Sequence, residues 1–249
     1  MSELQHPESR SFEQVAQLYE RVRPEYPPDA VAWIVEELDL RPGRTVLDLA
    51  AGTGKLTRQL VPTGAEIIAV EPGEAMLAEL RRAVPNVTAL HGAAELIPLD
   101  DGSVDAITVG QGFHWFRFDE AVAEMHRVLR SGGGVALMWN GRDQDDELQQ
   151  EVTALMDPFV PAGRAKSQDS SGFLDESPLF GAMEERTFRF AQRLDVDALI
   201  GRIMSISFVA AASRERRAEL ERQLREVAAA RGGTFDFPYV TSVYVSRAV

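Results

Sequence analysis

The chain has 249 residues, 45% of them apolar and 26% charged, which suits one α/β domain with insertions. Its formal net charge of −13 repels nucleic-acid phosphates on average and argues against DNA or RNA as the main partner. The absence of cysteine excludes disulfides, a thiolate nucleophile and cysteine metal sites, and the four histidines lack the paired spacing of metal ligands.

Residues 1–44 are predicted to form two helices. Residues 11–27 indicate a short helix broken by prolines, and residues 27–40 a helix with proline in its first turn that ends near residues 41–43. The first residues lack the apolar segment of a secretory signal, and no apolar run in the chain approaches the ~18 residues of a membrane span. We therefore expect a cytoplasmic protein with no membrane partner.

Residues 45–142 alternate short apolar runs with amphipathic stretches. The apolar runs, predicted as strands, are 45–50, 66–71, 87–92, 104–110 and 134–140. The predicted helices between them are 54–61, 73–84 and 118–130. Nearly continuous apolar strands separated by amphipathic helices are typical of a parallel sheet covered on both faces, and so of a doubly wound fold.

Residues 143–249 follow a different pattern. The predicted elements are a helix at 145–159, a loop at 161–172, a strand at 183–194, helices at 196–213 and 213–230, and a strand at 239–249. We expect the two strands to join the same sheet and the helices to cover its ligand-binding edge as a substrate cap. The expected architecture is one structural domain, a doubly wound, mostly parallel seven-stranded Rossmann-like sheet with helical cap insertions.

The turn after the first strand lies in the stretch VLDLAAGTGKLT, residues 46–57, and consists largely of small residues. A P-loop is excluded because Leu49 occupies a glycine position and Leu56 replaces the hydroxyl that would hold magnesium. A dinucleotide fingerprint would require glycine where the chain has Ala50 and Lys55. The remaining interpretation is a turn with an acid, Asp48, at the end of the strand. Its negative charge suits a ligand that carries an amino group and a sulfonium better than it suits a pyrophosphate.

With this turn, the sequence resembles the class I methyltransferases that use S-adenosylmethionine, in particular their small-molecule branch. The likeness runs through residues 46–54, 69–72, 91–116 and 127–140. The Tyr-x3-Arg-Pro-x-Tyr-Pro segment at residues 19–27 and a His-Trp-Phe loop are most similar to the branch that includes trans-aconitate-type methyltransferases. The resemblance implies the cofactor S-adenosyl-L-methionine, with the N-terminal helices as a lid over it.

The resemblance also implies where the cofactor lies. The turn from Asp48 to Gly54 would bind its methionine end, and Glu71, which ends the second strand, would accept hydrogen bonds from both ribose hydroxyls. Many relatives carry an acid where this chain has Ala93, so the adenine would rely on the backbone N–H of Ala94 or on Glu95. The residues expected at the cofactor are Tyr19, Arg23, Asp48, Ala50, Gly52, Thr53, Gly54, Glu71, Pro72, Met76, Ala93, Ala94, Glu95, Gln111, Gly112 and Trp115.

Residues 110–116, GQGFHWF, are expected to overlook the transferred methyl group. Aromatic faces in this loop would attract a sulfonium through cation–π interaction. His114 is the candidate catalytic residue, as a general base if the acceptor is an alcohol or phenol, whereas a carboxylate acceptor needs no base. The residues expected to face the substrate are Tyr26, His114, Trp139, Asn140 and Arg142, and no metal is expected.

Enzymes that methylate nucleic-acid amino groups generally carry an Asn/Asp-Pro-Pro-aromatic tetrapeptide at this loop, and this chain has none. We therefore expect methyl transfer to an oxygen, carboxylate or hydroxyl, of a small organic metabolite by in-line displacement. Two alternatives remain open. One is an S-adenosylmethionine-binding sensor or assembly protein without turnover, and the other is a nicotinamide-dependent dehydrogenase.

Overall fold

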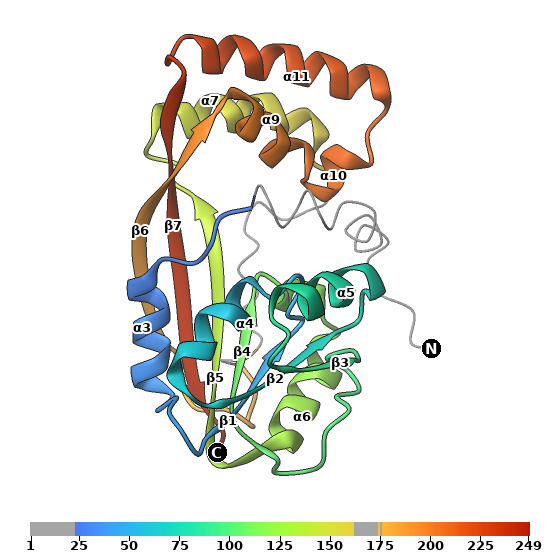
Figure 1. Ribbon diagram of the computed structural model, residues 1–249, viewed down its shortest axis with the longest axis vertical. Helices are drawn as coiled ribbons and strands as arrows, with labels where there is room; N and C mark the ends of the chain where they lie inside the picture. The colour runs from blue at the N-terminus through green and yellow to red at the C-terminus, as the bar shows by residue number, and fades with distance from the viewer. Residues whose placement is uncertain (1–22, 162–173, 175) are drawn as a thin grey trace.

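A computed structural model describes residues 23–161, 174 and 176–249, so Tyr19 and most of the helix expected at 11–27 lie outside the described residues. The described chain contains a seven-stranded sheet with the order β3–β2–β1–β4–β5–β7–β6 (Figure 1). The strands are β1 (Thr45–Leu49), β2 (Glu66–Glu71), β3 (Thr88–His91), β4 (Val104–Gly110), β5 (Leu129–Arg142), β6 (Glu184–Asp195) and β7 (Thr234–Arg247). The first five run parallel, and β7 is antiparallel to both β5 and β6. The predicted doubly wound, mostly parallel sheet of seven strands is confirmed.

Helices cover both faces of the sheet, as the apolar strands require. Successive strand residues point to opposite faces, so Val46 packs in one cluster with Ile34 of α3, while Leu47 packs in the other with Met125 of α6. The helices around the sheet are α3 (Pro28–Glu37), α4 (Lys55–Leu60), α5 (Glu74–Ala83) and α6 (Phe118–Val128), with the short 3-10 helices η1 (Val61–Thr63) and η2 (Phe113–Trp115). Both faces of the sheet are therefore removed from water around β1 and β4.

A separate group of helices, here called the cap, lies beyond the carboxyl ends of the parallel strands (Figure 1). It comprises α7 (Glu147–Met156), η3 (Asp157–Phe159), α9 (Val196–Met204), α10 (Ser207–Ala210) and α11 (Arg214–Ala229). Three of these helices begin with a side chain that accepts a hydrogen bond from a backbone N–H of the first turn: Asp146 for α7, Asp195 for α9 and Ser213 for α11. The ends of β6 and β7 reach into the cap and complete its apolar core.

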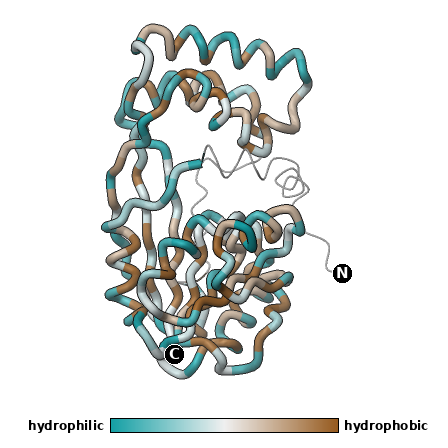
Figure 2. Tube along the Cα trace, viewed as in Figure 1, coloured by the Kyte–Doolittle hydropathy of each residue, from teal (hydrophilic) through white to brown (hydrophobic). Residues whose placement is uncertain are grey.

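Hydropathy along the chain follows this arrangement. Figure 2 shows hydrophobic residues concentrated in the strands, whereas the outer helix α11 is largely hydrophilic. Only its residues Leu220, Leu224 and Ala228, spaced at helical intervals, are buried against the rest of the cap. No helix in the described parts of the chain has both the length and the apolar composition that crossing a bilayer requires.

Most element boundaries differ from the predicted ones by one to three residues, and three elements differ in more than that. The helix expected at 196–213 is divided into α9 and α10. Strand β5 begins at Leu129, which pairs with Val104, so α6 ends earlier than predicted. Strand β7 begins at Thr234, because Phe235 and Phe237 alternate with exposed residues and bury their rings in the cap. Nearby glycines and Pro238, which usually mark a turn, conceal this strand start in the sequence.

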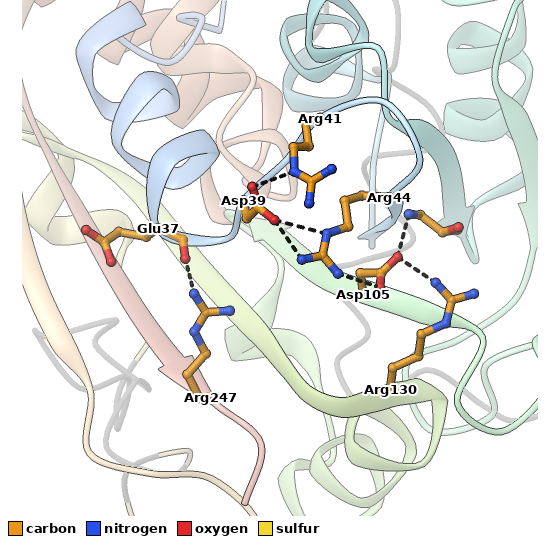
Figure 3. Close-up of polar contacts among 8 residues, drawn as sticks. Glu37, Asp39, Arg41, Arg44, Asp105, Arg130 and Arg247 are labelled. Atoms are coloured by element: carbon orange, nitrogen blue, oxygen red, sulfur yellow. Dashed lines mark hydrogen bonds and ion pairs between the residues drawn. The ribbon is translucent and has the colours of Figure 1, made fainter.

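An ionic network ties the strand starts together at the end of the sheet away from the cap (Figure 3). The carboxylate of Asp105, only 10% exposed, accepts hydrogen bonds from the Thr45 N–H at 2.8 Å, from Arg130 at 2.6 Å and from Arg44 at 3.2 Å. Arg44 also binds Asp39 at 2.6 Å. Burial opposes ionisation of Asp105, but these donors outweigh it, and the pKa of its carboxyl is lowered.

This network predicts an acid-sensitive contribution to stability. At pH 7, Asp105→Asn should lower the free energy of unfolding by about 1–3 kcal/mol, because buried donors lose a charged acceptor. A lowered folded-state pKa gives stability that is present above the ordinary aspartate pKa and lost as the pH falls through the folded value. Urea unfolding should therefore show a smaller difference from wild type at pH 3 than at pH 7.

Asp101→Asn is the matched control for Asp105→Asn. The Asp101 side chain is 82% exposed and pairs with Arg127 at the surface, so its loss should change stability little. Equal losses in the two variants, or a loss for Asp105→Asn that does not depend on pH, would contradict the assigned role.

Candidate functional site

A cavity opens between the sheet and the cap, at the carboxyl ends of β1, β2, β4 and β5. It is open to solvent, and the space between its walls together with the solvent at its mouth amounts to about 1400 Å³. The loops that follow these strands supply most of its wall, the segment before α3 supplies a second part, and Arg202 of α9 borders it from the cap. In doubly wound sheets ligands bind at this edge. The residues that line the cavity are therefore the candidate functional site.

The turn after β1 has a backbone that few side chains tolerate. Ala50 has φ 55° and Gly52 has φ 59°, both in the left-handed region. A non-glycine residue there costs about 1–2 kcal/mol. The turn is held by its neighbours, because the Ala51 N–H donates to the carbonyl of Val70 at 3.1 Å. Strain of this kind is typical of functional loops, and here it bends the chain along the cavity wall.

Glu71, at the end of β2, is the main polar support of this turn. One carboxylate oxygen accepts the N–H of Gly52 at 2.9 Å, and the other accepts the N–H of Gly73 at 2.8 Å. Burial raises the pKa of Glu71 to about 7, although the two N–H groups oppose the shift; the charge of Asp48 adds to it. The carboxylate therefore both orders the wall and borders the cavity.

Asp48 lies at the bottom of the cavity and is fully buried. Its two oxygens accept hydrogen bonds from the hydroxyls of Thr57, at 2.5 Å, and Thr108, at 3.0 Å. Burial raises its pKa to about 6, against the effect of these hydroxyls. The site thus places two carboxyl groups close enough for their charges to repel, and each of them accepts hydrogen bonds from two hydroxyl or backbone N–H groups.

The loops after β3 and β4 are joined across another wall of the cavity. Glu95 accepts the backbone N–H of Arg117 at 2.8 Å, while Ala93 and Ala94 line the cavity beside it. Met76 of α5 is 5% exposed and lines the same region. This part of the wall is mostly apolar, which suits a flat uncharged ring better than a phosphate.

Gln111 follows β4 with φ 62°, a second left-handed residue that is not glycine. Its N–H donates to the carbonyl of Met138 at 2.8 Å, and its side-chain amide donates to the carbonyl of Asn140 at 3.2 Å. The loop after β4 is therefore fixed to β5, and it holds an amide side chain at the cavity.

Two glycines beside Gln111 permit close approach of other elements. A Cβ at Gly110 would collide with the hydroxyl of Tyr26, and a Cβ at Gly112 would lie 2.8 Å from the Cβ of Ala50. These contacts bring the segment before α3 and the turn after β1 directly against the loop after β4. The three segments consequently form one continuous wall.

The segment before α3 connects the core to the cap, and Figure 1 shows it passing between them. Arg23 donates to the Ser205 hydroxyl at 3.2 Å and to the Ser205 carbonyl at 3.1 Å, at the end of α9. Glu25 pairs with the Nζ of Lys55 at 3.4 Å. Tyr26 is 6% exposed. These contacts hold the segment along the open side of the cavity.

Most of the residues predicted for the site lie together at this cavity. They are Arg23, Tyr26, Asp48, Ala50, Gly52, Thr53, Glu71, Pro72, Met76, Ala93, Ala94, Glu95, Gln111, Gly112, Trp115 and Asn140. Tyr19 is outside the described residues. These residues share one cavity, and their roles in binding stay predictions.

Four predicted residues do not line the cavity. Gly54 caps α4 beneath the turn. The ring of His114 lies 4.7 Å from that of Trp115, centroid to centroid. Trp139 points to the opposite face of β5 from Asn140, since strand residues alternate, and packs against the rings of Phe113 and Tyr244. Arg142 contacts the sulfur of Met156 in the cap at 3.2 Å.

Sequence reasoning missed three charged residues of the cavity: Lys55, Arg117 and Arg202. Lys55 directly follows the Gly-Thr-Gly turn and is 8% exposed, so its place next to the motif was a usable signal. Arg202 is the only basic residue in the apolar helix α9, where a basic residue on a buried face is itself unusual.

Comparison with known proteins gives a consistent result. A family described as "Methyltransferase domain" matches residues 47–137. An uncharacterized methyltransferase of Schizosaccharomyces pombe is 32% identical over 246 residues, 96% of this chain and 98% of that protein. An uncharacterized methyltransferase of Mycobacterium tuberculosis is 50% identical over 136 residues, 55% of this chain and 54% of that protein, so the match spans about half of that relative's length.

Among solved structures, a protein from Anaeromyxobacter dehalogenans assigned as a type II methyltransferase is similar over most of its length. The two chains superpose with a TM-score of 0.67 and 26% identity, covering 90% of this chain and 97% of the other.

The buried carboxyl of Glu71 predicts a pH dependence of stability. Its folded-state pKa of about 7 lies above the ordinary 4.5, so the native state keeps a proton that the unfolded chain releases. Stability from this group is therefore present below pH 4.5 and lost as the pH rises to 7, by up to about 3 kcal/mol. In Glu71→Gln, urea unfolding should show a smaller fall between pH 5 and pH 8 than in wild type.

The pKa of Asp48 is also raised, to about 6, so the free energy of unfolding of Glu71→Gln should still fall somewhat as the pH rises. Glu74→Gln serves as the control, because its side chain is 80% exposed and lies near the same loop. If the stability curves of wild type and Glu71→Gln ran parallel across this pH range, Glu71 would not carry the raised pKa.

Proposed function

The chain belongs to the methyltransferase family, whose cofactor is S-adenosyl-L-methionine, and from this premise we propose that it transfers the methyl group to an oxygen of a small organic metabolite. The observation that carries the proposal is the single cavity that joins the acid-tipped turn after β1, Glu71 and the loop after β4. The reaction would be an in-line displacement, in which placement of the acceptor oxygen and exclusion of water supply most of the rate.

The residues of the cavity fit this cofactor. Asp48 borders the cavity at the turn where a dinucleotide would place its diphosphate, and its charge would repel that group. Lys55, the basic residue next to the turn, is paired with Glu25. A nucleoside with ribose hydroxyl donors and a positively charged sulfur is the ligand that this charge pattern favours.

Each part of the cofactor has a matching region of the wall. Glu71 would accept hydrogen bonds from the ribose hydroxyls, in addition to the two backbone N–H groups that it already holds. Met76 and Ala94 would enclose the adenine. The turn from Asp48 to Thr53, with Arg23, would hold the methionine end. When bound, the cofactor supplies an electrophilic methyl group on a sulfonium.

The chain's own residues would position the acceptor and keep water out. The side chains of Gln111 and Asn140 place amide groups at the ends of β4 and β5, where the cavity meets the cap. Trp115 and Tyr26 supply aromatic rings to the wall, and such rings attract a sulfonium by about 0.5–2 kcal/mol. The proposal also includes the N-terminal region as a lid and the cap as the substrate-binding part of residues 143–249.

The finer likeness to trans-aconitate-type methyltransferases, through residues 23–27 and the His-Trp-Phe loop, supports a small organic acid as the acceptor. The net charge of −13 repels nucleic-acid phosphates on average, so the proposal includes no nucleic-acid partner. The sensor and the dehydrogenase remain as outcomes that the following experiments distinguish from turnover of S-adenosylmethionine.

Cofactor binding gives the first test. S-adenosylhomocysteine should raise the thermal unfolding temperature of the protein, and NAD at the same concentration should not. Glu71→Ala should weaken S-adenosylhomocysteine binding by about 1.5–3 kcal/mol in calorimetry, because a charged acceptor is lost. Glu74→Ala, a change of the exposed acid nearby, should leave the affinity unchanged. Protection by NAD alone would favour the dehydrogenase, and binding without labelled product from a metabolite extract would favour the sensor.

The acceptor decides whether a base is needed. We propose His114 as the general base for a hydroxyl acceptor only, although its ring lies against Trp115 and outside the cavity wall. With such an acceptor, His114→Gln should lower kcat/KM by about 100-fold. With a carboxylate acceptor the same variant should retain the wild-type rate. A variant that behaved alike with both acceptors would remove His114 from the chemistry.

A further inference from the structure

Arg202 is a buried cation with an unsatisfied donor at the cap side of the cavity. It extends from α9, is 6% exposed and lines the cavity. Its Nε donates to the hydroxyl of Tyr239 at 3.0 Å, and its Nη1 is buried with no hydrogen-bond partner among the described residues. A guanidinium has five N–H donors, and leaving one of them buried and unpaired is costly. An acceptor from outside the chain would remove this cost.

Arg142 is a second, half-buried cation near Arg202. It does not line the cavity, but it pairs across the strands with Tyr239, the residue whose hydroxyl accepts a hydrogen bond from Arg202. It ends β5 two residues after Asn140, so the two residues share one face of the strand. Its Nη1 contacts the sulfur of Met156, a weak acceptor, at 3.2 Å. Burial, followed by the positive charge of Arg202, lowers the pKa of Arg142 to about 10. The two guanidinium groups are therefore close enough to repel each other.

No carboxylate of the described residues forms an ion pair with either Arg142 or Arg202, although most other arginines in the described part of the chain are paired. The charge of Asp157 raises the pKa of Arg142, but the two residues form no ion pair. A buried cation and a half-buried one, close together and without a counter-ion among the described residues, are unfavourable. In a chain with a net charge of −13, an unpaired buried Arg202 in the wall of a ligand cavity points to a bound anion.

We infer that Arg202 and Arg142 bind a carboxylate of the methyl acceptor, which makes the acceptor an organic acid whose second oxygen group receives the methyl. This inference rests on the proposed function. A guanidinium fork matches the two oxygens of a carboxylate, and binding there would both satisfy the buried Nη1 and relieve the repulsion. Arg23, fixed to Ser205 at the end of α9, adds a third positive charge on the same side of the cavity.

The carboxylate that binds the two arginines could belong to the methyl acceptor or to the methionine end of the cofactor. Binding experiments distinguish these two sources. The protein, saturated with S-adenosylhomocysteine and held at constant ionic strength, is titrated calorimetrically with succinate, citrate and benzoate, and with succinamide and benzamide as neutral counterparts. We expect at least one acid to bind and its amide not to bind. Arg202→Gln and Arg142→Gln should each weaken acid binding by about 10- to 100-fold and leave the affinity for S-adenosylhomocysteine unchanged.

Arg217→Gln is the matched control, since Arg217 is exposed on α11 of the same cap. It should change neither affinity. Arg202→Lys keeps the charge but not the fork, so it should lose part of the acid binding. Arg142→Gln provides an independent variant if Arg202→Gln does not fold, as thermal unfolding of each variant would show.

Three results would overturn the inference: no binding of any of the acids to wild type, equal binding of acids and amides, or unchanged acid binding in both glutamine variants. A loss of S-adenosylhomocysteine affinity in Arg202→Gln, with acid binding intact, would assign the pair to the cofactor and also overturn it. If S-adenosylhomocysteine does not bind wild type, the proposed function fails, and the same titrations without it still test the arginine pair.

Discussion

The carboxylate of Glu71 holds two backbone N–H groups, those of Gly52 and Gly73, and the shape of the site depends on this arrangement. It joins the turn after β1 to the turn that begins α5, so that the ends of two neighbouring strands are fixed relative to each other. Burial makes its ionisation unfavourable. The protein therefore gives up stability at neutral pH to keep an acceptor at the edge of the cavity, a compromise expected of a binding site.

The loop after β4 packs directly against the turn after β1. Ala50 and Gln111 both adopt left-handed backbone conformations, and the missing side chain of Gly112 lets Ala50 contact it closely. The two loops are in close contact here, because a Cβ at Gly112 would lie 2.8 Å from the Cβ of Ala50. Backbone strain at the end of one strand is thus accompanied by close packing against the loop that follows another.

Much of this architecture was accessible from the sequence, because its signals are local. Apolar runs alternating with amphipathic stretches gave the order of strands and helices in residues 45–142, and the small residues around Gly52 marked the ligand edge. Features that depend on contacts between distant segments were not accessible. The position of Arg202 against Tyr239 requires the packing of α9 on β7, and Trp139 was placed with Asn140 although neighbouring strand residues face opposite sides.

The pairing of β6 with β7 continues without interruption from the core into the cap and ends where Asp195 faces Thr234. The whole of α9, α10 and α11 therefore leaves and re-enters the sheet through one pair of neighbouring residues. In topological terms these helices are an enlarged hairpin loop. Such an insertion is modular: it can be shortened, lengthened or exchanged during evolution without disturbing the ladder, so the cap can diversify while the parallel core stays constant.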